Sequence, residues 1–105
     1  MGPEQLRGQL DDTQVIDVRD DDEWTEGHID GAVHIPMEEV EDRLSELSDD
    51  GQIVAVCRTG KRSGTIAVRL RELGHDADNL DGGVQAWVDA GHELVAADGT
   101  RGWVA

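Results

Sequence analysis

Short apolar runs alternate with amphipathic segments along this chain. Four apolar runs predict strands, at residues 14–18, 32–35, 53–57 and 77–80. Apolar residues at helical spacing, together with helix start and stop signals, predict helices at residues 3–10, 37–47, 63–73 and 83–90. Strands that alternate with helices indicate an α/β domain on a mainly parallel sheet. In such sheets ligands bind at the carboxyl ends of the strands.

The only cysteine of the chain, Cys57, lies at one of these carboxyl ends. It follows the apolar run Ile53–Val56 and precedes the helix that we expect from Ser63. At a strand-to-helix turn the first backbone N–H groups of the helix lack partners and the helix dipole is positive, which favours a bound anion and a thiolate. A lone cysteine after an apolar strand is often an inert buried thiol. Three cations and a glycine within the next five residues favour a reactive cysteine instead.

Length and cysteine content limit the kind of protein. At 105 residues we expect a single domain, residues 1–105, with one core of moderate stability. One cysteine excludes an internal disulfide and leaves no zinc spacing or C-x-x-C redox pair, so we expect no metal and no cofactor. No apolar stretch approaches the ~20 residues of a membrane span, and the N-terminus lacks a charged-then-apolar signal pattern. These features predict a cytoplasmic protein that does not enter a membrane.

Charge is unevenly distributed along the chain. Twenty-four acidic residues stand against nine basic ones, which gives a formal net charge of −15. Such a surface repels nucleic acid and anionic lipid, and an acid-rich chain with one Lys and no Phe or Tyr is typical of a salt-adapted, halophilic proteome. Between Asp50 and Glu72, however, there is no acidic residue and there are five basic ones. A positive field around Cys57 within a negative shell predicts a small anionic substrate.

Four motifs occur in order along the chain. They are Asp17–Arg19, Gly27–Ala32 followed by Ile35 and Pro36, the loop Cys57–Ser63, and Leu80–Gly83 with Trp87. Together they resemble the single-domain rhodanese sulfurtransferases over about residues 3–91, with residues 92–105 as a C-terminal extension of unknown role. The resemblance implies a five-stranded, mainly parallel sheet flanked by helices on both faces, and Cys57 as a persulfide-forming nucleophile. Asp17 and Arg19 are expected to support the loop as an ion pair or through hydrogen bonds.

The residues of the loop also favour sulfur chemistry when they are considered without the family resemblance. A thiolate attacks electrophilic sulfur readily, and thiosulfate carries a sulfane sulfur on an anionic sulfite leaving group. The cations of the loop would neutralise the departing sulfite, and its backbone N–H groups would cradle the sulfur. The residues predicted to bind the substrate are Arg58, Thr59, Gly60, Lys61, Arg62 and Ser63. The persulfide would then pass its outer sulfur to cyanide or a thiol.

Alternative interpretations of the loop remain. Cysteine phosphatases and arsenate reductases also place a thiolate in an anion-binding loop, but they put one more residue between the cysteine and the clamping arginine than the four between Cys57 and Arg62. A phosphate-binding P-loop needs Ser or Thr where Arg62 stands. The same persulfide would also serve a sulfur carrier or interaction module with a dedicated partner. The sequence therefore leaves open whether the acceptor is a small molecule or a protein.

Overall fold

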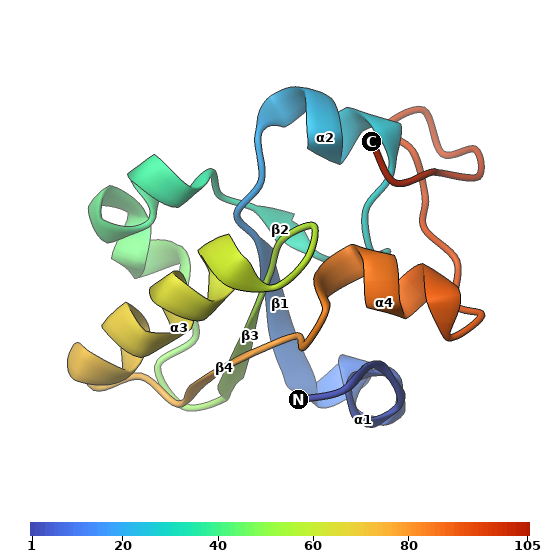
Figure 1. Ribbon diagram of the computed structural model, residues 1–105. Coiled ribbons are helices and arrows are strands. Elements are labelled where there is room, and N and C mark those ends of the chain that lie inside the picture. The colour runs from blue at the N-terminus through green and yellow to red at the C-terminus, as the bar shows by residue number, and fades with distance from the viewer.

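A four-stranded parallel sheet forms the centre of the domain (Figure 1). The computed structural model describes all 105 residues. The strands are β1 (Thr13–Asp17), β2 (Val33–His34), β3 (Gln52–Val56) and β4 (Ala77–Asn79). Their spatial order is β2-β1-β3-β4, and every pairing is parallel. The predicted α/β fold is confirmed, and each strand lies within or beside one of the four apolar runs.

The expectation of a fifth strand is wrong for this chain. The other extended pairings are isolated antiparallel bridges of Val95 with His28 and with Arg101, and both lie outside the named strands. A single bridge does not make a ladder, so these residues add no strand to the sheet. The sheet therefore keeps four strands, with β2 and β4 at its edges.

Helices cover both faces of the sheet. One face carries α1 (Pro3–Gly8) and α4 (Gly83–Asp89), and the other carries α3 (Lys61–Glu72) with the 3-10 helices η2 (Met37–Glu39) and η3 (Glu41–Glu46) (Figure 1). A further 3-10 helix, η1 (Leu10–Asp12), leads into β1, and α2 (Asp21–Glu26) follows β1 at the top of the view. The longest helix, α3, has 12 residues, and none of the helices is both long and apolar enough to cross a bilayer.

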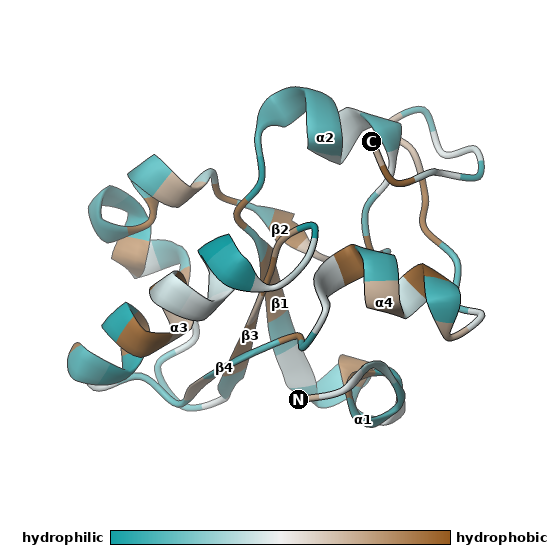
Figure 2. Cartoon of the chain, viewed as in Figure 1, coloured by the Kyte–Doolittle hydropathy of each residue, from teal (hydrophilic) through white to brown (hydrophobic).

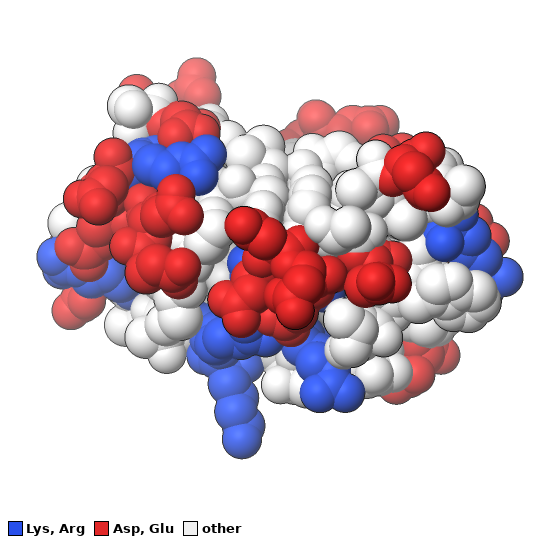
Figure 3. All heavy atoms as spheres, turned by 90° about the horizontal axis from the view of Figure 1, so that it is seen from above, with Lys and Arg blue, Asp and Glu red and all other residues white.

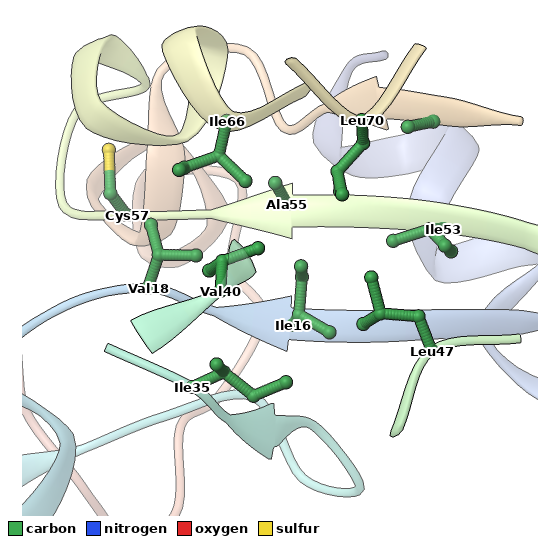
Figure 4. Packing of buried hydrophobic residues seen from close by; sticks show 11 residues of the cluster. Ile16, Val18, Ile35, Val40, Leu47, Ile53, Ala55, Cys57, Ile66 and Leu70 are labelled. Atoms are coloured by element: carbon green, nitrogen blue, oxygen red, sulfur yellow. The ribbon is translucent and has the colours of Figure 1, made fainter. Parts of the chain in front are cut away.

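Alternate side chains of the central strands pack into two separate cores. On one face, Ile16 of β1 and Ile53 and Ala55 of β3 pack against Ile66 and Leu70 of α3 (Figure 4). The second core consists of Leu6, Val15, Ile29, Val54, Val56, Leu80, Val84, Trp87 and Leu94. Hydrophobic residues accordingly run along the central strand β3, while α2 is largely hydrophilic (Figure 2). Burial on both faces explains why the strands read as continuous apolar runs.

The segment predicted as one helix, residues 37–47, forms two 3-10 helices instead. Its backbone departs from helical geometry at Arg43, where φ is −121° and ψ is 26°. Leu44 and Leu47 are three residues apart, a spacing that a 3-10 turn also places on one face. The apolar pattern alone therefore did not distinguish the two helix types.

Residues 92–105 pack back onto the domain. Leu94 joins the second core, the backbone N–H of Trp103 donates to Glu26 at the end of α2, and Val95 exchanges backbone hydrogen bonds with His28. Gly27 lies so close to Gly102 and Trp103 that a Cβ on it would overlap their backbone. The C-terminal segment thus braces the end of α2.

Candidate active site

Cys57 lies one residue beyond β3, at the entrance to the turn that leads into α3. Its sulfur is in the core cluster on the α3 side of the sheet (Figure 4), and the residue is only 1% exposed. The backbone N–H of Gly60 donates to Sγ at 3.1 Å, and the hydroxyl oxygen of Ser63 lies 3.2 Å from it. Gly60 is the residue before α3 and has a φ of +99°, which a residue with a Cβ adopts only at a cost. The turn therefore brings the N–H of Gly60 and the hydroxyl of Ser63 within hydrogen-bond distance of the sulfur.

These donors lower the pKa of Cys57. Burial of the sulfur is the largest influence and raises the pKa, because it removes the thiolate from water. Hydrogen bonds from the side chain and backbone of Ser63 and from the backbone of Gly60 and Thr59 act in the opposite sense and together outweigh burial. The pKa of Cys57 therefore lies below that of an ordinary cysteine, as expected for a nucleophilic thiol.

The loop cations fall into two groups. Arg58 and Lys61 are exposed, and neither lies within 4.0 Å of a carboxylate oxygen. Their charges are thus free to meet an incoming anion. The face seen from above carries a central cluster of acidic side chains with basic side chains along its border (Figure 3).

Arg62 is engaged within the protein. Its guanidinium donates two hydrogen bonds to the carboxylate of Glu23 on α2, at 2.8 and 2.9 Å. The pair lowers the pKa of Glu23 and raises that of Arg62. The nearby Cys57 thiolate also raises the pKa of Arg62, so Arg62 lies within electrostatic range of the sulfur. Arg62 was predicted as a loop residue from the sequence, whereas its pairing with Glu23 was not predicted.

The position of Glu23 follows from local sequence. Asp20 caps α2 and forms a capping box with Glu23, three residues later, whose carboxylate accepts the backbone N–H of Asp20 at 3.2 Å. Trp24 is stacked against both His28 and His34, with ring centroids 3.5 and 4.9 Å apart. Neither α2 nor the contact of Glu23 with the loop was among the predictions from the sequence.

Asp17 and Arg19 form a buried ion pair. Arg19 donates to both carboxylate oxygens of Asp17, at 2.8 to 3.2 Å, and also to the carbonyl of Gly27 at 2.6 Å. Both residues are at most 1% exposed, and neither makes a hydrogen bond to residues 57–63. Arg19 instead bonds the residue that follows α2, the helix that carries Glu23, and loop support by this pair stays a prediction.

The turn between β4 and α4 holds the other side of the loop. Val84 donates its backbone N–H to the carbonyl of Cys57 at 2.9 Å, and Gln85 donates to that of Arg58 at 3.1 Å. Gly83 lies against the same backbone, and a Cβ on it would overlap Cys57 and Arg58. Asn79, at the end of β4, contacts both Gly60 and Ser63. From the sequence, Gly83 was predicted to begin a helix and to belong to the Leu80–Gly83 motif, and no role was predicted for Asn79.

A sizeable cavity lies away from the cysteine loop. It has a volume of about 610 Å³ and is lined by residues such as Arg7, Val15, Trp87 and His92, with none from the cysteine loop. Cavity size therefore does not identify the reactive centre. Donors from Gly60 and Ser63 and the cations of the loop gather instead around Cys57.

Residues 2–90 match the family model described as the rhodanese-like domain. Among curated proteins, the proposed sulfurtransferase YtwF of Bacillus subtilis is 41% identical over 73 residues, covering 70% of this chain and 71% of YtwF. The thiosulfate sulfurtransferase GlpE of Pseudomonas aeruginosa is 35% identical over 89 residues, covering 83% of this chain and 81% of GlpE. The proposed sulfur carrier protein YrkF of Bacillus subtilis is 36% identical over 74 residues, 70% of this chain but only 40% of YrkF.

A solved structure shares the fold over nearly the whole domain. The crystal structure of a rhodanese-related protein from Thermoplasma volcanium superposes with a TM-score of 0.86 at 27% sequence identity. The match covers 90% of this chain and 95% of the other.

Proposed function

Because this chain belongs to the rhodanese-like domain family, we propose that it is a sulfurtransferase that carries sulfane sulfur as a persulfide on Cys57. The single observation that carries the proposal is the environment of the Cys57 sulfur. Backbone and hydroxyl donors from Gly60 and Ser63 surround it at a strand-to-helix turn. Such donors stabilise a thiolate and would equally stabilise the anionic outer sulfur of a persulfide.

In the first step the Cys57 thiolate attacks the sulfane sulfur of the donor. With thiosulfate, the new bond joins Sγ to that sulfur, and the sulfur–sulfur bond of thiosulfate breaks. Its electron pair leaves with sulfite, SO₃²⁻, and the enzyme keeps Cys57-S-S⁻. Total charge is unchanged, and no proton or external oxidant is needed.

Arg58 and Lys61 favour an anionic donor such as thiosulfate. Both are exposed at the edge of the loop without a carboxylate partner, so they can neutralise the doubly charged sulfite as it leaves. The name of the relative GlpE supports the same donor.

In the second step an acceptor takes the outer sulfur. Cyanide attacks it to give thiocyanate, or a thiolate attacks it to give a new persulfide, and in both cases the thiolate of Cys57 is restored. Donor and acceptor react in turn with one cysteine, which is a ping-pong cycle.

A phosphatase or arsenate reductase activity is less compatible with this loop. The arginine that would clamp a tetrahedral oxyanion is Arg62, and both its terminal nitrogens are already bonded to Glu23. The loop is also one residue too short for that geometry.

A second candidate is a sulfur carrier for one partner protein. Arg58, Thr59 and Lys61 are all exposed around the buried cysteine, so a partner that binds the loop could reach the outer sulfur. The name of YrkF supports a carrier role.

Steady-state turnover tests the proposal. Purified protein with thiosulfate and cyanide should form thiocyanate with parallel lines in a double-reciprocal plot, and Cys57→Ser should form none. Stoichiometric loading of Cys57 without turnover, followed by transfer to a thiol-bearing protein, would favour the carrier. No loading from thiosulfate or any other sulfane donor would contradict both.

A further inference from the structure

Asn79 connects two parts of the cysteine loop from outside it. It is the last residue of β4, and its side-chain nitrogen Nδ2 donates to the carbonyl of Gly60 at 3.1 Å. Its oxygen Oδ1 is in close hydrogen-bond contact with the hydroxyl of Ser63. Because Nδ2 needs an acceptor and Oδ1 a donor, the two contacts together fix the orientation of the amide.

This arrangement gives Ser63 two competing acceptors. Its hydroxyl carries one proton and lies within reach of both Asn79 Oδ1 and the sulfur of Cys57, the latter at 3.2 Å. A hydroxyl donates one hydrogen bond at a time but accepts two. Asn79 Oδ1 only accepts, so the short contact between Asn79 and Ser63 requires the proton of Ser63.

The protonation state of Cys57 decides which acceptor the hydroxyl serves. While Cys57 is a thiol, its S–H can donate to the oxygen of Ser63, and the hydroxyl of Ser63 donates on to Asn79. When the thiol loses its proton to solvent, the sulfur becomes an acceptor, and the hydroxyl must turn from Asn79 to meet it. Asn79 Oδ1 then loses its donor.

We propose that Asn79 is a positioning residue of this site, which fixes the loop through Gly60 and competes with the Cys57 sulfur for the hydroxyl of Ser63. The inference rests on the proposed function only in taking Cys57 as the nucleophile. Asn79 therefore opposes the ionisation of Cys57. Its Oδ1 has a hydrogen-bond donor when Cys57 is a thiol and none when Cys57 is a thiolate.

Charged groups on the loop and on the elements around it must be separated from this effect. They are Arg58, Lys61 and Arg62 in the Cys57–Ser63 loop, Glu23 on α2 with Asp20 just before it, and the buried pair of Asp17 at the end of β1 and Arg19 two residues later. Asn79 is neutral, so its influence acts through contact and persists in about 1 M salt, where fields from exposed charges are screened beyond ~3 Å.

The test is the pH dependence of Cys57 alkylation by iodoacetamide, measured in about 1 M salt. Asn79→Leu, which can neither donate nor accept, should lower the midpoint by about half to one pH unit, the equivalent of one neutral hydrogen bond. Ser63→Ala should raise it, and the double variant should behave like Ser63→Ala. Asn79→Asp, which keeps an acceptor oxygen and adds negative charge, should raise the midpoint.

A midpoint in Asn79→Leu that is unchanged or raised would overturn the proposal. The proposal would also be overturned if Asn79→Leu lowered the alkylation midpoint by the same amount in a Ser63→Ala protein, since the effect requires the Ser63 hydroxyl. Asn79→Ala serves as a second neutral variant if the leucine is not accommodated.

The unaltered protein provides an independent measurement. The side-chain amide resonances of Asn79 should titrate with the same midpoint as Cys57 alkylation, and resonances that stay constant over that range would contradict the proposal. Alkylation requires no sulfur donor. A protein with the expected shifts that is never persulfidated would refute the proposed function while leaving this inference intact.

Discussion

Glu23 and Arg62 are 39 residues apart in the chain, yet their side chains form a two-pronged ion pair beside the cysteine loop. The side chain of Glu23 is 17% exposed and that of Arg62 is 36% exposed, so the pair lies at the edge of the site. It ties α2 to the first turn of α3. It also neutralises one loop cation, which leaves Arg58 and Lys61 as the charges available to an anionic substrate.

Glu23→Gln should reduce stability in a pH-dependent way. The hydrogen bond from Arg62 holds the pKa of Glu23 below its usual range, so the pair stabilises the fold above the unfolded-state pKa and is lost as pH falls through the lower folded-state pKa. We expect a loss of about 1 kcal/mol at pH 7, which fades as pH falls below about 4. Urea unfolding at several pH values measures both the loss of stability and its dependence on pH.

The same substitution should lower the KM for thiosulfate several-fold, because it removes a negative charge and frees Arg62 to meet the donor. Glu26→Gln is the matched control, since Glu26 lies on the same helix, is exposed and makes no ion pair. Equal effects of the two substitutions would show that net charge, and not the pair with Arg62, is responsible.

Lys61→Ala should raise the KM for thiosulfate more than it lowers kcat. Lys61 is exposed and unpaired, so its charge attracts the donor across solvent, and the effect should be on the order of 1 kcal/mol. In about 1 M salt the Debye length falls to ~3 Å and the penalty should disappear. Arg7→Ala, on α1 and outside the loop, removes the same charge and controls for long-range effects. A Lys61→Ala penalty that is unaffected by salt would indicate a direct contact instead.

The place of Cys57 could be predicted from the sequence because each signal for it is local. The apolar run of β3 ends at the cysteine, and the start of α3 follows within a few residues. The partner of Arg62 could not be predicted, since Glu23 meets it only through the packing of α2. The contacts of Asn79 could not be predicted from the sequence for the same reason. They depend on β4 lying next to β3 in the sheet.

Gly83→Ala should destabilise the protein more than Gly74→Ala. Both glycines have positive φ, +63° and +94°, so each alanine bears a left-handed penalty of about 1–2 kcal/mol. At Gly74 nothing lies within 4 Å of a Cβ, whereas at Gly83 the Cβ would overlap the backbone of Cys57 and Arg58. We expect a total of roughly 3 kcal/mol at Gly83 with reduced sulfur transfer, measured by thermal unfolding and turnover. Similar losses of stability at both positions would mean that the loop backbone moves to accommodate the added Cβ.

Cys57 should become a thiolate at a lower pH than an ordinary cysteine. Hydrogen bonds from Ser63, Gly60 and Thr59 outweigh the opposing effect of burial, so the midpoint of alkylation against pH should lie below the ~8.5 of a free cysteine. Because these donors act by contact, the midpoint should change little between low salt and about 1 M salt. A midpoint that returns to the free value in high salt would assign the shift to the loop cations.

If Cys57 carries the transferred sulfur, intact-protein mass spectrometry should detect that sulfur on the protein. After incubation with thiosulfate and desalting, the protein should gain one sulfur atom, which cyanide or dithiothreitol then removes. Cys57→Ser treated in the same way should gain none. A Cys57→Ser protein that acquires the same sulfur, or an unaltered protein that acquires none from any sulfane donor, would contradict the account.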